Sequence, residues 1–228
     1  MQLSTTSATR RTALAVTVVA FLTGACGGSP GKRASEPREA GVSAHSICDG
    51  TLDSSAVQAL QRLAGTDRFD EATGTNEAGE SRAFSLRNAV RHLHDEYGKR
   101  SACWVYRTGD NSGYPLMEIR FSASQSYPSN SAKRSEGGEV SYPLGVFAQV
   151  GRTGAELFFK CSSEASSATS YIGDVKYVKG EMYSNAAGLR GDSVDEDRMV
   201  ILNSVSRAVA EQAGCAPEAD LPTAVPSA

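Results

Sequence analysis

The chain has 228 residues, of which 40% are hydrophobic and 21% are charged, and its formal net charge is −3. No block of lysine and arginine follows the first 25 residues, which excludes the basic surface of a nucleic-acid-binding protein and the polybasic segment that anionic lipid attracts. Residues 1–25 hold two arginines and no acidic residue, so the rest has 21 basic residues against 26 acidic ones, a net charge of −5.

The first 25 residues have the layout of an export signal. Arg10 and Arg11 precede an apolar run of ten residues, 13–22, whereas a membrane span needs about 20. The run fits the apolar region of a signal peptide, and the small residues 23–25 fit its cleavage site. We therefore predict a signal peptide over residues 1–25, directly before Cys26.

Residues 22–26, Leu-Thr-Gly-Ala-Cys, resemble the bacterial lipobox, with Thr23 where that motif usually has leucine. The resemblance implies that the Cys26 thiol receives a diacylglyceryl group and holds the protein on the outer face of the cell membrane. The alternative is an ordinary signal peptide that releases a soluble protein. Residues 9–14 also resemble a twin-arginine signal, and the choice of export route stays open.

Composition divides the remaining chain into three parts. Residues 26–45 are predicted to be a flexible tether, because 27–41 carry both charges and no apolar residue larger than alanine or proline. Residues 46–215 are predicted to form a single α+β domain, long enough to bury one core. The segment 216–228, rich in proline and alanine, is predicted to be a disordered tail.

Four cysteines remain once Cys26 is assigned to the lipid: Cys48, Cys103, Cys161 and Cys215. An even number in an oxidising compartment predicts two disulfides. Neighbouring cysteines are more than 40 residues apart, whereas zinc sites use close pairs such as CxxC, so we predict no metal site. Three connectivities are open, and we favour Cys48 with Cys103 and Cys161 with Cys215.

Helical periodicity marks three segments. The first helix is predicted from Asp53 or Ser54 to Gly65. The second covers 84–97, before the stop signal of a glycine and two basic residues. The third follows a capping-box pattern and extends over 193–214.

Between the second and third helices the hydrophobic pattern changes to a period of two. Strands are predicted at 103–107, 116–123, 144–150 and 155–161, the last two as a hairpin, and 175–183 fit an additional edge strand. Alternation within 116–123 indicates one buried face and one wet face, which carries Glu118, Arg120 and Ser122. In the hairpin, Leu157, Phe159 and Cys161 are expected to face the core. We therefore predict an α+β fold: an antiparallel sheet of about four strands, two helices before it and one after it, in a two-layer sandwich.

Three local patterns suggest chemistry, and each has a simpler structural explanation. The segment 109–113 around Ser112 resembles a protease serine segment, but a turn accounts for it better. Within 92–96 the two histidines diverge on a helix, so a surface pair of His92 with Glu96 is expected in place of a metal site. The acidic group 192–197 fits a helix start better than a calcium loop. We predict no catalytic residue, metal or cofactor.

Several segments together carry a resemblance: CDGTL at 48–52, CWV at 103–105, YPLGV at 142–146, LFFKC at 157–161 and VSRAVA at 205–210. On these the chain resembles small exported lipoproteins of actinomycetes whose function is unknown. The resemblance implies the location and the pattern of cysteines, and it carries no activity or site residue.

Two classes of function remain. The preferred one is a non-catalytic, envelope-associated module that binds a protein, a cell-wall component or a small apolar ligand, in an oligomeric state that the sequence leaves open. The alternative is an extracellular hydrolase with a dispersed acidic site, with Asp174 and Glu181 as candidate participants. A deep pocket holding at least two convergent titratable groups would favour the hydrolase.

Overall fold

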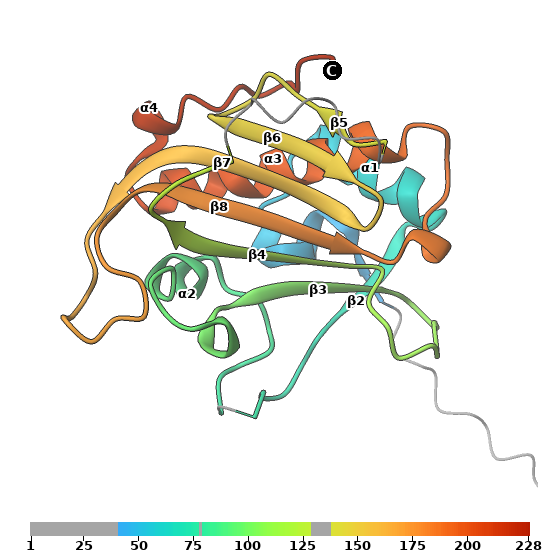
Figure 1. Cartoon of the computed structure of the whole chain (residues 1–228). Helices are drawn as coiled ribbons and strands as arrows, with labels where there is room; N and C mark the ends of the chain where they lie inside the picture. Colours follow the sequence, from blue (N-terminus) through green and yellow to red (C-terminus); the bar gives the residue numbers. More distant parts are fainter. Residues whose placement is uncertain (1–40, 78, 129–137) are drawn as a thin grey trace, which may run out of the picture. The chain divides into compact units, whose positions relative to one another are not determined.

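The computed structural model describes residues 41–77, 79–128 and 138–228 (Figure 1). The predicted signal peptide, Cys26 and most of the predicted tether lie outside these residues. The described residues belong to one compact unit, Glu39–Ala228. None of their helices combines the length and the apolar character that crossing a membrane requires.

The described fold is built on one antiparallel sheet of eight strands, in the order β1-β2-β3-β4-β8-β7-β6-β5. The predicted sheet of about four strands is therefore wrong in size. The strands are β1 (Val42–Ser43), β2 (Arg68–Glu71), β3 (Ala102–Arg107), β4 (Met117–Ser124), β5 (Val140–Ser141), β6 (Phe147–Gly151), β7 (Gly154–Ser163) and β8 (Val175–Ser184).

The four predicted strands correspond to β3, β4, β6 and β7, whereas β1, β2 and β5 have too little hydrophobic alternation to be recognised. β1 and β5 have two residues each, too few to show alternation. β2 contributes one buried apolar residue, Phe69. β8 was expected at an edge but lies in the middle, between β4 and β7. Because one face of this sheet is polar, a central strand has the same alternating pattern as an edge strand.

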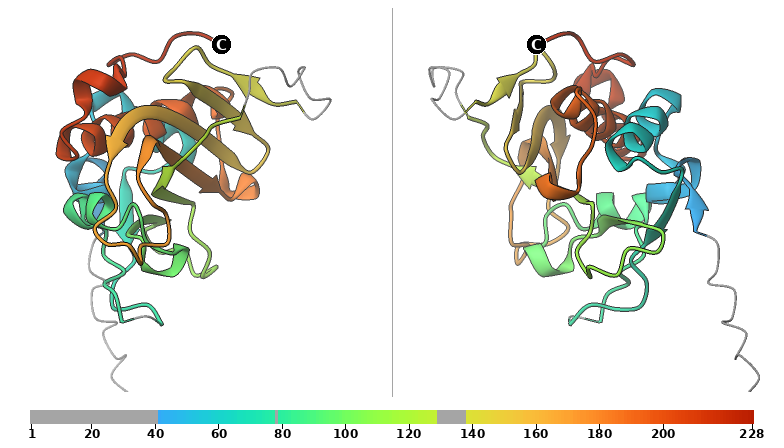
Figure 2. Two further views of the ribbon diagram at one scale, coloured as in Figure 1. Left: turned by 60° about the vertical axis from the view of Figure 1, so that its left-hand side comes forward. Right: turned by 90° about the vertical axis from the view of Figure 1, so that its right-hand side faces the viewer.

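Helices cover one face of the sheet (Figure 2). The predicted first helix is α1 (Ser54–Ala64), where the Asp53 carboxylate accepts hydrogen bonds from the first-turn amides and Gly65 ends the helix in the left-handed conformation. α1 packs on the predicted last helix, α3 (Val194–Gln212), which packs on β6, β7 and β8. The shorter helices are α2 (Leu86–Arg91), α4 (Ala216–Ala219), η1 (Ala44–Gly50), η2 (Tyr97–Lys99) and η3 (Ala186–Gly188).

The predicted helix over 84–97 is too long. α2 ends at Arg91, and two residues later the carbonyl of Leu93 accepts a hydrogen bond from the Ala123 amide of β4, 2.8 Å away. Leu93 is buried. Contact with the sheet therefore replaces the helical hydrogen bonds beyond the first turns.

The ordered fold also extends past both predicted domain boundaries. Residues 42–45 were assigned to the tether, yet Val42 and Ser43 pair with β2 and Ala44 is fully buried. Residues 216–228 were expected to be disordered, but they contain α4, and Leu221 packs against the core. The Asn203 side chain of α3 donates to the Pro222 carbonyl at 2.8 Å, which holds this segment on the helix.

The structure contains both favoured disulfides. Cys48 joins Cys103 with a Cα–Cα distance of 5.3 Å, which ties η1 to β3. Cys161 joins Cys215 with a Cα–Cα distance of 5.2 Å, which ties β7 to the start of α4. Two disulfides are compatible with an extracytoplasmic protein.

Gly180 allows α3 to lie close to the middle of β8. A Cβ atom at this position would lie 2.9 Å from a ring carbon of Phe121, 3.1 Å from the Ser206 hydroxyl and 3.3 Å from a methyl carbon of Leu202. All three neighbours are buried. A side chain here would therefore push the sheet away from the helix.

We expect Gly180→Ala to lower the free energy of unfolding by about 1–3 kcal/mol, because an added methyl group overpacks a filled core. Urea unfolding followed by circular dichroism measures the change. Gly98→Ala is the matched control, since a Cβ atom there meets nothing within 4 Å and should change stability by less than about 0.5 kcal/mol. Equal unfolding midpoints for the two variants would contradict the close approach of α3.

Candidate functional site

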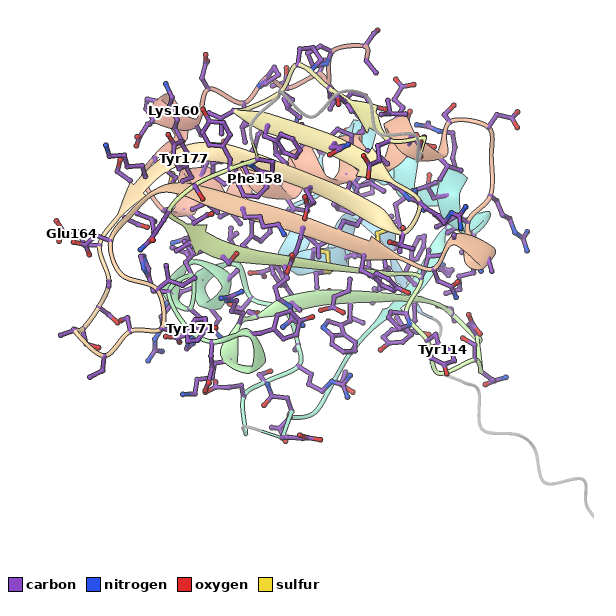
Figure 3. All side chains as sticks on the ribbon, viewed as in Figure 1. Tyr114, Phe158, Lys160, Glu164, Tyr171 and Tyr177 are labelled. Atoms are coloured by element: carbon purple, nitrogen blue, oxygen red, sulfur yellow. A yellow bond between two sulfur atoms is a disulfide. The ribbon has the colours of Figure 1, made fainter. Side chains whose placement is uncertain are left out.

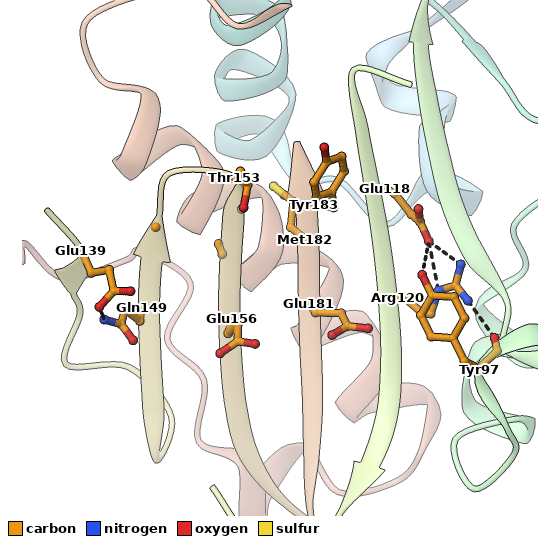
Figure 4. Close-up of a pocket in the computed structure, with 13 residues that line it drawn as sticks. Tyr97, Glu118, Arg120, Glu139, Gln149, Thr153, Glu156, Glu181, Met182 and Tyr183 are labelled. Atoms are coloured by element: carbon orange, nitrogen blue, oxygen red, sulfur yellow. Dashed lines mark hydrogen bonds and ion pairs between the residues drawn. The ribbon is translucent and has the colours of Figure 1, made fainter. Parts of the chain in front are cut away.

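The face of the sheet opposite α1 and α3 carries an open pocket of about 470 Å³. Strands β4, β6, β7 and β8 form its floor, and η2 borders it on the β4 side (Figure 4). The pocket is lined by Tyr97, Glu118, Arg120, Glu139, Gln149, Gly151, Thr153, Gly154, Ala155, Glu156, Glu181, Met182 and Tyr183.

Two glycines create the depression at one end of the floor. Gly151 and Gly154 face each other across the β6–β7 hairpin, and Gly154 is also opposite Tyr183 of β8. A Cβ atom on Gly154 would lie 1.9 Å from the Met182 carbonyl oxygen, so only glycine fits. Across the sheet from Tyr183, the paired positions on β7 and β6 are therefore glycines without side chains.

The centre of the floor holds two glutamates on neighbouring strands. Glu156 of β7 and Glu181 of β8 are register partners, and Figure 4 shows their carboxylates side by side. Lys179 joins them, with its Nζ 2.7 Å from Glu156 Oε1 and 2.9 Å from Glu181 Oε2. Burial opposes the charged ammonium, but these hydrogen bonds outweigh it and raise the pKa of Lys179.

The β4 side of the pocket is a compact group around Arg120. Its guanidinium carbon lies 3.7 Å from the centre of the Tyr97 ring, and one nitrogen donates to the Tyr97 carbonyl at 2.7 Å. Its Nε also donates to Glu118 Oε1 at 3.1 Å, an atom that accepts from the Tyr97 hydroxyl at 3.4 Å. Burial, more than the neighbouring carboxylates, raises the pKa of Tyr97.

The group around Arg120 shows that the predicted wet face of β4 is wrong for two residues. Glu118, Arg120 and Ser122 were expected on the wet face of β4, yet Arg120 and Ser122 are only 6% and 8% exposed. η2 places Tyr97 over Arg120, so a polar residue on the outer face is covered by a neighbouring segment.

Aromatic rings extend the same face beyond the carboxylates (Figure 3). Phe158 contacts Phe147 edge to face at 5.7 Å, and Lys179 Nζ lies 5.7 Å from the Phe158 ring. Tyr177 makes a similar edge contact with Tyr127 at 4.9 Å. The outer face therefore combines charged groups with aromatic rings, of which Phe158 is buried and Tyr127 is exposed.

The histidine segment forms different contacts from those predicted. His92 Nδ1 lies 2.6 Å from Asp95 Oδ2, whereas Glu96 pairs with Lys99 at 3.0 Å. The expected pair of His92 with Glu96 is wrong because α2 ends at Arg91, before either residue.

His94 is buried and fastens a loop. Its Nδ1 lies 3.0 Å from the Ile172 carbonyl oxygen and its Nε2 lies 2.9 Å from the Ser163 hydroxyl. Neither His94 nor Ser163 lines the described pocket. The contacts therefore connect the segment before β8 to the end of β7.

The protease and hydrolase candidates differ in whether they line the pocket. Ser112 lies in a turn, where its amide donates to Asp110 at 2.8 Å. Glu181 lines the pocket, but Asp174 does not, and its carboxylate accepts from the Ala165 amide at 2.8 Å. Of the three residues considered for a protease or hydrolase site, Ser112 and Asp174 are thus held in loops, and Glu181 lines the pocket.

The acidic residues at the start of α3 include one with a buried role. Asp197 is 1% exposed and accepts from Arg62 Nε of α1 at 3.2 Å. This hydrogen bond raises the pKa of Arg62. The predicted helix start is present, but the Ser193 side chain makes no capping hydrogen bond, so the predicted capping box is wrong. Asp197 instead holds α1 against α3.

Among the described residues, one group of three possible metal ligands has its ligand atoms within 4.8 Å of one another: Cys48, Glu71 and Cys103. Both sulfurs belong to a disulfide, and Glu71 Oε1 accepts from the Cys48 amide at 2.9 Å. Burial raises the pKa of Glu71. The group therefore supports the turn at Cys48 and is unsuited to a metal.

Comparison of the chain with protein-family models, curated proteins and solved structures finds no match. The pocket and its chemistry are therefore the basis for a function.

Proposed function

We propose that this chain is a lipid-anchored, extracytoplasmic binding module that holds its ligand on the outer face of its sheet. The lipid anchor rests on Cys26 and the signal before it. The binding role rests on one observation, the convergence of side chains from β4, β6, β7, β8 and η2 on one open pocket. Solvent-facing positions of a sheet need only be polar, whereas these residues surround a shared space.

The composition of the pocket favours binding through polar and aromatic contacts. Nine of its residues carry polar or charged side chains: Tyr97, Glu118, Arg120, Glu139, Gln149, Thr153, Glu156, Glu181 and Tyr183. Pockets for small apolar ligands are mostly apolar, so that part of the initial hypothesis is less well supported than a protein or cell-wall ligand.

The hydrolase remains the alternative because Glu181 has a second carboxylate, Glu156, beside it. Paired carboxylates perform glycoside hydrolysis when one of them is protonated and acts as the acid. Here both carboxylates accept hydrogen bonds from the same ammonium of Lys179, whereas an acid and a base need different surroundings. The pocket is also open, whereas a deep pocket would favour a hydrolase. Binding without catalysis is therefore preferred.

Native mass spectrometry of the lipoprotein purified from its source membrane tests the proposal. We expect a bound molecule on the wild type that Tyr183→Ala loses, because this side chain borders the pocket and is 57% exposed. Tyr114→Ala is the matched control, since Tyr114 is 70% exposed and outside the pocket (Figure 3). A bound molecule retained equally by both variants, or absent from the wild type, would contradict the proposal.

A further inference from the structure

The charge of the pocket identifies the class of ligand. Among the described residues, the carboxylates of Glu118, Glu156 and Glu181 line it, and they are balanced by Arg120 and, beside the pocket, Lys179. These five residues keep an excess of one negative charge. An electrostatically complementary occupant is cationic.

The central carboxylates have acceptor positions left for such an occupant. Glu156 binds Lys179 through Oε1 and Glu181 binds it through Oε2. Among the described residues, none donates a hydrogen bond to the second oxygen of either carboxylate. Like charges directly opposite on neighbouring strands repel, and one lysine compensates only part of this repulsion.

The aromatic rings of this face already bind cations of the chain itself. Arg120 lies over Tyr97 at 3.7 Å, Arg82 over Trp104 at 4.6 Å and Lys179 near Phe158 at 5.7 Å. Tyr183 offers a further ring that is 57% exposed, on the same strand face as Glu181. A cation from outside would thus meet a ring and carboxylates together.

The dimensions favour an extended peptide over a small molecule. Gln149, Glu156, Glu181 and Arg120 form one row across β6, β7, β8 and β4. Three strand spacings make this row about 14 Å long. An extended peptide spans that distance in about four residues and presents alternate side chains to one side. Exposed tyrosines at its border are typical of protein-binding surfaces.

We propose that the pocket binds a basic segment of a partner protein, in which alternate lysine or arginine side chains reach the glutamate row and the ring of Tyr183. This inference rests on the binding role proposed above. Lys179 then acts as an internal competitor, because its ammonium occupies part of the carboxylate pair that the ligand cation needs.

The probe is a fluorescent peptide of four Lys-Ser repeats, titrated into the mature lipoprotein in non-ionic detergent. We expect the dissociation constant to rise about tenfold in Glu156→Gln/Glu181→Gln and to fall about threefold in Lys179→Met. Glu164→Gln, on the loop after β7 and outside the pocket (Figure 3), should leave it unchanged. Affinity should also fall as salt is added.

The two variants should change the dissociation constant in opposite directions, which a general loss of stability would not do. Near-ultraviolet circular dichroism verifies that each variant is folded. Weaker binding by Lys179→Met, unchanged binding by the folded double glutamine variant, or equal binding of a Glu-Ser repeat would overturn the inference. If the basic peptide fails to bind while Tyr183→Ala still loses a co-purified molecule, the ligand class is wrong and the pocket's binding role stands. If both results are negative, both proposals fail.

Discussion

Replacing Cys161 and Cys215 by alanine should lower the free energy of unfolding by about 4 kcal/mol, because the disulfide closes a loop of 54 residues in the unfolded chain. The bond also fastens β7 to the segment that carries α4. Urea unfolding of the chain from Gly27 onward measures the loss. A non-reducing peptide map should show that Cys48 and Cys103 remain joined in the variant.

The corresponding variant of Cys48 and Cys103 is an internal comparison, because its loop of 55 residues has almost the same length. Here the backbone at Cys48 and Asp49 is left-handed, with φ of 54° and 58°, which costs about 1–2 kcal/mol per non-glycine residue. Without the disulfide this turn can relax, so the free energy of unfolding should fall less than in the Cys161/Cys215 variant. An unfolding midpoint of the Cys161/Cys215 variant equal to that of the wild type would contradict the stabilising role.

Cys26→Ser should abolish membrane retention, since serine lacks the thiol that receives the diacylglyceryl group. We expect unprocessed precursor or protein released into the medium. Two acyl chains anchor stably because each buried methylene contributes about 0.8 kcal/mol, so the effect should be close to all or none. Fractionation and labelling with a fatty-acid analogue measure retention and lipidation.

Thr23→Leu is the matched control for this variant, because it introduces the usual lipobox residue three positions before Cys26. It should retain the label and the membrane location. Mature, membrane-bound protein in the Cys26→Ser variant would show that the chain is held by something other than a lipid on Cys26.

The parts of the fold that depend on local interactions were predictable. α1 is specified by the Asp53 cap, its apolar stripe and Gly65, all within one short segment. The β6–β7 hairpin follows from alternation around Gly151 and Gly154, and Leu157, Phe159 and Cys161 are buried as expected. The disulfide pairing was favoured among three open connectivities, and only the folded chain distinguishes them.

The position of β8 shows where local patterns stop being informative. Its alternating residues suit any strand with one buried and one solvated face, whether central or at an edge. Its place between β4 and β7 depends on backbone hydrogen bonds to segments far away in the chain. The same pairing brings Glu156, Glu181 and Arg120 into one row, so the candidate site was equally hidden.

The sequence alone determined the ends of α1 and the β6–β7 hairpin, and it motivates the prediction of a lipid on Cys26, because each of these depends on neighbouring residues. Tertiary structure alone decided the sheet of eight strands, the central place of β8, the Tyr97 cover over Arg120 and the pocket. The physical reason is that strand order is set by pairing between distant segments, which leaves no periodic signal within any one of them.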